Sequence, residues 1–149
     1  TVGGPYDAGR ESVTHAQFNA AYSFARALTD ARVDLRSYQT PALSEPAVVA
    51  LTARTHVIDD PGIDPTTQTA RVKVTLNDGR TVEATSDTMK GSPAEPMSED
   101  ELLAKFHGCL EFGVGAPRAQ TERLAEVAMT LETMADAAVA IVAAFPPSD

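Results

Sequence analysis

The sequence predicts an α+β fold, with a small antiparallel sheet covered by helices and followed by C-terminal helices. Apolar residues recur at helical spacing near the start, alternate with polar residues in the middle, and return to helical spacing after residue 98. With 149 residues, of which 43% are hydrophobic, the chain is long enough for one globular core and too short for two of ordinary size.

The N-terminal part predicts an arm and two helices. Residues 1–13 contain three glycines and one proline without apolar periodicity, which is typical of an extended arm or linker. Thr14 and Gln17 have the spacing of a capping box, and a helix is expected to follow. Its apolar stripe comprises Phe18, Ala21, Tyr22, Ala25 and Leu28. A shorter helix is expected from Ser44, with Pro46 in its first turn.

The middle of the chain predicts a β-hairpin. Apolar residues at even positions from 70 to 76 alternate with polar ones, which indicates one apolar and one wet face. Asp78 and Gly79 suit a tight turn, and residues 81–85 continue as the partner strand. Residues 55–58 are also β-prone, whereas residues 59–65 predict a loop. We expect the early helices to cover one face of this sheet.

The C-terminal part predicts further helices. Ser98 and Glu101 form another capping box, ahead of an expected buried stripe. This stripe comprises Leu102, Leu103, Phe106 and Leu110. Gly113 and Gly115 end the helix, and Pro117 is well suited to open the next one.

The last predicted helix has no polar face. Residues 137–145 are all apolar, and either Thr133 or Asp136 can cap them. A helix that is apolar all round is expected to be buried on all sides, because each exposed larger side chain forgoes roughly 1.5–3 kcal/mol. Something outside the small sheet is therefore expected to cover it, and this favours self-association or a missing partner.

Composition argues against several classes of partner. Twelve Lys and Arg against 21 Asp and Glu give a net charge of −9, which disfavours nucleic acid because binding there depends on neutralising phosphates. The most apolar run falls far below the ~20 residues that span a bilayer, so no membrane partner is expected. Cys109 is the only cysteine, which excludes an intrachain disulfide and fits a reducing cytoplasm.

No residue cluster predicts a metal site. His15, His56 and His107 lack metal-ligand spacing and are expected to be exposed or capping residues. Cys109 lies on a predicted helix and is expected to be a buried thiol. The aspartates of the 59–65 loop lack the ordered alternation of an EF-hand.

Three segments together resemble one enzyme family. Residues 16–22 read Ala-Gln-Phe-Asn-Ala-Ala-Tyr, and residues 74–80 form the hairpin sequence Val-Thr-Leu-Asn-Asp-Gly-Arg. The third segment runs from Lys90-Gly91-Ser92-Pro93 through Ser98 to Lys105-Phe106. Their order and spacing are similar to the C-terminal portion of the MmgE/PrpD family, which includes 2-methylcitrate dehydratases.

The resemblance implies both a fold and a chemistry. Its members have a large helical domain and a smaller α+β lid, after which the chain returns to the helical domain. Residues 1–97 would then be the lid, with residues 1–13 as an arm. Residues 98–149 would pack on the missing helical domain or on a second copy. The family moves or removes a proton next to a carboxylate, as in dehydration of 2-methylcitrate, decarboxylation of cis-aconitate or epimerisation. No organic cofactor is implied.

The same resemblance assigns a catalytic role to Tyr22. A phenol of ordinary pKa ≈10 is ready as a proton donor at neutral pH, whereas action as a base requires a nearby cation such as Arg26. The alternative interpretation is a core aromatic whose hydroxyl lies at the rim. Asn19 stands where the family usually has serine, which leaves a polar role there open.

Two functions follow as hypotheses. In the first, the chain is part of a lyase or isomerase, binds a small carboxylate substrate only with the helical domain, and is inactive alone. In the second, it is a noncatalytic binding or assembly module that uses the apolar C-terminal helix.

Overall fold

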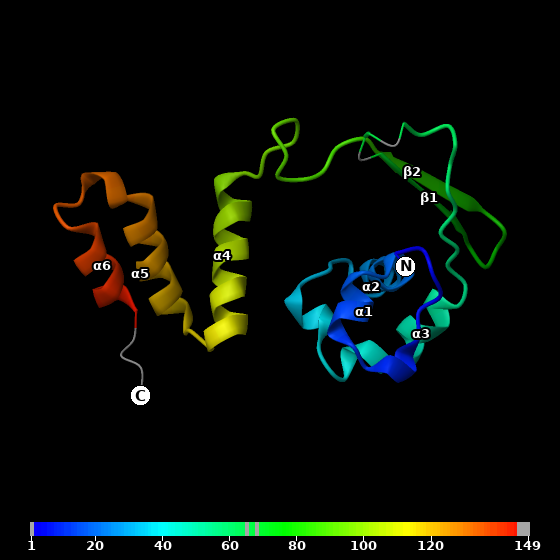
Figure 1. Cartoon of the computed structure of the whole chain (residues 1–149), viewed down its shortest axis with the longest axis horizontal. Coiled ribbons are helices and arrows are strands. Elements are labelled where there is room, and N and C mark those ends of the chain that lie inside the picture. Colours follow the sequence, from blue (N-terminus) through cyan, green and yellow to red (C-terminus); the bar gives the residue numbers. More distant parts are fainter. Residues whose placement is uncertain (1, 65, 68, 146–149) are drawn as a thin grey trace. The chain divides into compact units, whose positions relative to one another are not determined.

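The computed structural model describes residues 2–64, 66–67 and 69–145. The chain divides into two compact units, residues 1–59 and residues 60–149. The described residues contain six α-helices and one two-stranded antiparallel sheet, which confirms the α+β class (Figure 1).

The first unit has two short helices where the sequence predicted one. α1 spans Val13–Gln17 and α2 spans Ala20–Asp30. The chain breaks between them because Asn19 takes an extended conformation and its side chain accepts a hydrogen bond from the Tyr22 backbone N–H at 2.9 Å. Ser12, and not Thr14, caps α1 through the backbone N–H of His15. The predicted capping box was therefore wrong, and Asn19 caps a new helix that starts at Ala20.

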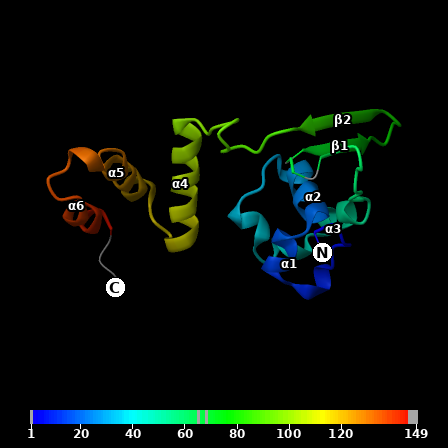
Figure 2. The same ribbon diagram turned by 45° about the horizontal axis from the view of Figure 1, so that its top comes forward.

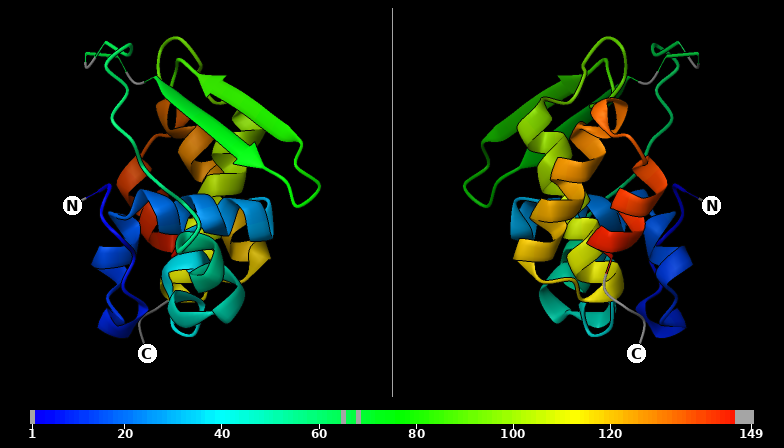
Figure 3. Two further views of the ribbon diagram at one scale, coloured as in Figure 1. Left: turned by 90° about the vertical axis from the view of Figure 1, so that its right-hand side faces the viewer. Right: turned by 90° about the vertical axis from the view of Figure 1, so that its left-hand side faces the viewer.

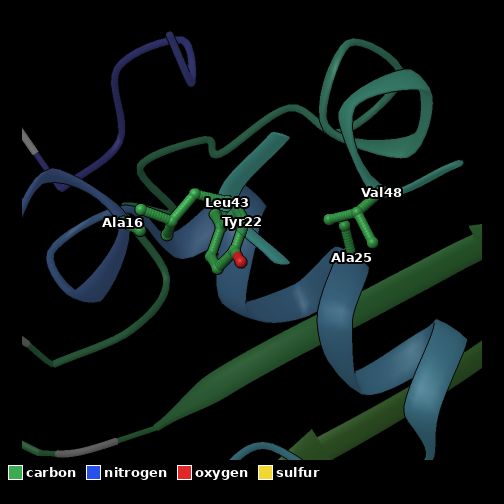
Figure 4. Packing of buried hydrophobic residues seen from close by; sticks show 5 residues of the cluster. All are labelled: Ala16, Tyr22, Ala25, Leu43 and Val48. Atoms are coloured by element: carbon green, nitrogen blue, oxygen red, sulfur yellow. The ribbon is translucent and has the colours of Figure 1, made fainter. Parts of the chain in front are cut away.

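A small core joins α1 and α2 to the segments that follow them. Its five buried residues are Ala16, Tyr22, Ala25, Leu43 and Val48, as Figure 4 shows. α3 spans Pro46–Thr52 with the proline in its first turn, as predicted, although it starts two residues after Ser44. Phe18 and Leu28 were expected in the buried stripe but are 66% and 49% exposed.

The second unit begins with the predicted hairpin. β1 spans Ala70–Thr75 and pairs with β2, Thr81–Ser86, in the antiparallel register that places Val74 opposite Val82 (Figure 2). Gly79 has φ +86°, a conformation that a residue with a side chain rarely adopts, so the turn depends on this glycine. All of β2 is exposed. Residues 55–58 form no strand, contrary to their β-prone composition.

Three helices follow the hairpin. α4 spans Glu99–Val114, α5 spans Arg118–Met129 and α6 spans Ala137–Ala144. α5 packs against both α4 and α6 (Figure 3). Both halves of the Ser98 capping box are present, and Gly115 ends α4 with φ +64°. The predicted starts at Ser98 and Pro117 and the stop at Gly115 are thus confirmed, whereas Gly113 lies within α4; Asp136 caps α6.

The apolar surfaces of these helices are less buried than their composition predicts. Leu102 is 53% exposed, and the other three residues of the predicted α4 stripe are only partly buried. On α6, Val139 and Val142 are 64% and 73% exposed. The described part of the chain therefore leaves much of α6 open to solvent.

Replacing Ser98 with alanine is expected to destabilise the start of α4. The change removes the oxygen that accepts the Glu101 N–H and should lower the free energy of unfolding by about 1 kcal/mol. Urea unfolding together with hydrogen exchange in the first turn of α4 measures the loss. Ser98→Asp keeps a capping oxygen and should behave like the unsubstituted chain; an equal loss in both variants would contradict the cap.

Candidate functional site

The candidate residue Tyr22 lies inside the first unit. It is on α2, and its side chain is fully buried, with an exposed fraction of 0%. Its hydroxyl donates to the carbonyl oxygen of Ser37 at 2.5 Å, and the carbonyl oxygen of Ala42 lies 3.2 Å away. In this arrangement the phenol proton is held by the backbone that follows α2.

Two further tyrosines surround this ring. The ring centroid of Tyr6 lies 4.6 Å from that of Tyr22, and the centroid of Tyr38 lies 5.8 Å away. The Tyr38 hydroxyl shares a hydrogen bond of 3.0 Å with the Ser23 hydroxyl. The three rings form an aromatic cluster that none of the helical periodicities predicted, because Tyr6 lies in the arm and Tyr38 ends a short 3₁₀ helix, Leu35–Tyr38.

Electrostatics decide the protonation state of Tyr22. Burial raises the pKa of the Tyr22 phenol to about 12, and the positive charge of Arg26 opposes this only in part. The hydroxyl is therefore neutral at physiological pH. Arg26 is the cation that a base would require, but its effect is too small to make Tyr22 a phenolate. The chemistry open to Tyr22 is proton donation.

Arg26 has other partners that explain its orientation. Its guanidinium is almost fully buried and bonds Glu45 through Nη1 at 2.6 Å. Its Nε lies 3.4 Å from Asp30 Oδ2 and makes no hydrogen bond, so this contact is ionic only. The ion pair of Arg26 with Glu45 thus links α2 to the start of α3 and has a structural role.

An open cavity of about 370 Å³ lies beside Arg26. It is lined by Arg26, Asp30, Arg32, Asp34, Arg36 and Ser37. Three arginines and two aspartates line it, and Asp34 is shared between Arg32, at 2.9 Å, and Arg36, at 3.9 Å.

The N-terminal arm covers the aromatic cluster. The Tyr6 hydroxyl donates to the carbonyl oxygen of Leu43 at 2.7 Å, and the Tyr6 ring stacks on the His15 imidazole at 5.3 Å between centroids. After this contact the chain turns into a short 3₁₀ helix, Ala8–Arg10, capped by Asp7. The predicted arm is thus partly ordered on the first unit.

Two of the other expectations for single residues were wrong. His107 is buried, not exposed, and its Nδ1 lies 2.7 Å from the Thr121 hydroxyl oxygen. That hydroxyl donates to the carbonyl of Arg118, so Nδ1 carries the proton and donates to Thr121. Cys109 is exposed, not buried.

The site contains no metal-type cluster. Among the described residues, no group of three or more His, Cys, Asp or Glu side chains could hold a metal ion. Over the same part of the chain, no helix is both long and apolar enough to cross a membrane.

The fold and the site together define an α+β domain whose candidate group is a buried, protonated phenol. Residues 4–131 match the MmgE/PrpD C-terminal domain, and the chain belongs to this family. A search of curated proteins gave no match. The family match ends before α6, which spans Ala137–Ala144.

Alkaline pH is expected to destabilise the fold through Tyr22. The unfolded chain loses its phenol proton near pH ≈10, whereas the folded chain keeps it to about pH 12. The stabilisation is therefore complete below about pH 10 and is lost as the pH rises through about 12, a change on the order of 2–3 kcal/mol. Urea unfolding at a series of pH values from 9 to 12 measures it.

The matched variants for this experiment are Tyr22→Phe and Tyr38→Phe. The first should remove most of the alkaline slope; Tyr6, whose pKa burial also raises, should keep the remainder. The second leaves Tyr22 in place and should keep most of the slope. The same slope in Tyr22→Phe as in the unsubstituted chain would show that another group is responsible.

Proposed function

We propose that the chain is the C-terminal part of a lyase or isomerase that moves a proton next to a carboxylate, similar to 2-methylcitrate dehydratases. The observation that carries the proposal is membership of the family, over residues 4–131. In this proposal residues 1–97 form the lid and residues 98–149 return to a helical domain. The enzyme acts on a small carboxylate in the cytoplasm, where a single cysteine stays reduced.

Tyr22 is the proposed proton donor. Its phenol is neutral at physiological pH, so the hydroxyl carries a proton when a substrate arrives. To donate to a substrate, the hydroxyl must leave the carbonyls of Ser37 and Ala42. The proposal therefore includes a rearrangement around Tyr22 when substrate and helical domain are present.

The C-terminal helices are proposed to provide the contact with the helical domain. The exposed valines of α6, with Val142 73% exposed, supply an apolar surface that gains stability when it is covered. Met129, at the end of α5, adds another half-exposed apolar side chain. Without the helical domain, the catalytic groups that the family keeps there are absent, and the chain alone is expected to be inactive.

The proposal is tested by supplying the helical domain. The 149-residue chain and a complete enzyme with an MmgE/PrpD helical domain joined to it are assayed with 2-methylcitrate, cis-aconitate and related carboxylates. We expect turnover only in the complete enzyme. Turnover by the chain alone, or none in a folded complete enzyme with any carboxylate, would contradict the proposal.

Binding between the two parts can be measured without turnover. Val142→Asp places a charge on the exposed α6 surface and should abolish binding of a separately produced helical domain. Val82→Asp is the matched control, since Val82 is 55% exposed but lies on β2. Equal binding by both variants would show that α6 does not take part in the contact with the helical domain.

A noncatalytic assembly module is the second candidate. The exposed apolar side chains of α6 favour it, because a second copy could cover them as well as a helical domain could. Sedimentation of the chain over a range of concentrations tests it. Self-association that Val142→Asp abolishes would support this candidate, and a stable monomer would count against it.

A further inference from the structure

We propose that residues 2–7 form a strap that closes over Tyr22 and opens to expose it. The role of this opening in catalysis rests on the proposed function of Tyr22, whereas the opening itself does not. While residues 2–7 are in place, the buried hydroxyl of Tyr22 has no route to a substrate. Opening of the strap provides that route.

The strap is fastened to the first unit by a few discrete contacts. Four hydrogen bonds hold it: Ala20 N to Val2 O at 3.0 Å, Asn19 Nδ2 to Gly4 O at 2.9 Å, the Tyr6 hydroxyl to Leu43 O at 2.7 Å, and Asp7 N to His15 Nε2 at 3.1 Å. None of the six strap residues is fully buried. A segment with few contacts and little burial opens at a lower free energy than the core beneath it.

Tyr6 makes this opening relevant to Tyr22. The Tyr6 ring covers the Tyr22 ring, with centroids 4.6 Å apart. The two hydroxyls bond neighbouring backbone carbonyls, Leu43 for Tyr6 and Ala42 for Tyr22. Displacement of Tyr6 therefore exposes the side of the Tyr22 ring that carries the hydroxyl, while α2 and α3 stay in place.

Asn19 links the strap to the helix that carries Tyr22. It is 1% exposed, and the two ends of its amide have different partners. Oδ1 accepts from the Tyr22 backbone N–H, which caps α2, and Nδ2 donates to Gly4 in the strap. Asn19→Ser keeps an oxygen that can cap the helix but removes the donor that fastens the strap. This variant separates the two contacts.

Hydroxyl-radical footprinting of the full chain tests the strap, with the modification of each tyrosine measured by mass spectrometry. In Asn19→Ser, Tyr6 and Tyr22 should become more reactive together by roughly fivefold, the population change for loss of one hydrogen bond. Tyr38 should change less, because its hydroxyl bonds Ser23 and no strap residue. Asn77→Ser, at an exposed position in the hairpin, is the matched control and should change none of them.

A second variant keeps the test decisive if Asn19→Ser proves unstable. Tyr6→Ala removes the covering ring without altering the cap of α2, and Tyr22 should then become reactive while the urea transition remains cooperative. Unchanged Tyr22 reactivity in Tyr6→Ala would overturn the strap, as would a rise in Tyr6 alone in Asn19→Ser. Neither readout involves turnover, so failure of the strap is distinguishable from failure of the proposed function.

Discussion

Tyr22→Phe in the complete enzyme is expected to lower kcat by about 10²–10⁴-fold, the usual contribution of a positioned proton donor. The substitution removes the only group of Tyr22 that can transfer a proton and keeps its buried ring. KM should change far less, because the phenol acts on the reacting proton and not on substrate binding. Steady-state kinetics at saturating substrate measure the effect.

The structural cost of this change must be separated from the chemical one. Without its hydroxyl, residue 22 no longer satisfies the Ser37 carbonyl, which costs about 1–3 kcal/mol of stability. Tyr6→Phe is the matched control, since it also removes a phenol that donates to a backbone carbonyl, that of Leu43. Turnover of folded Tyr22→Phe within a few-fold of the Tyr6→Phe value would exclude Tyr22 as the donor.

Signals that act within a few residues were predictable from the sequence. The Ser98 capping box, the turn at Gly79 and the helix stop at Gly115 each depend on backbone geometry that neighbouring residues determine. The structure has all three. The break before α2 shows the limit of such rules. The helical period runs through Asn19, but the side chain of Asn19 caps a new helix there instead of continuing the first one.

Packing between distant segments was not predictable from periodicity. Helical spacing places Phe18 and Leu28 on the stripe of Tyr22, yet the break at Asn19 and the end of α2 leave both half-exposed or more. His107 is buried because Thr121, on another helix, satisfies its Nδ1. No signal near either residue in the sequence marks that pair.

The candidate site also combines a residue that the sequence predicted with surroundings that it did not predict. The resemblance to the family identified Tyr22, and the chemistry of a phenol predicted a donor. The raised pKa depends on burial, and the two carbonyl partners belong to Ser37 and Ala42, which lie in two short 3₁₀ helices, Leu35–Tyr38 and Ala42–Ser44. The covering by Tyr6 depends on an arm that composition predicted only as extended.

Leu43→Ala is expected to destabilise the first unit by about 2–5 kcal/mol, a large part of the stability of a domain this size. Leu43 is 1% exposed and packs in the core with Tyr22, so its removal leaves a cavity beneath the aromatic cluster. Its backbone carbonyl, which bonds Tyr6, is unchanged by the substitution. Urea unfolding followed by tyrosine fluorescence measures the loss, because all three tyrosines lie in this unit.

Leu28→Ala is the matched control, because the same atoms are removed from a side chain that is 49% exposed. Its cost should stay within about 1 kcal/mol, since water already contacts much of the leucine and no closed cavity forms. The two leucines therefore test which segments pack on Tyr22. If Leu28→Ala cost as much as Leu43→Ala, α2 would bury the face that its helical spacing predicts, and the core described for this unit would be wrong.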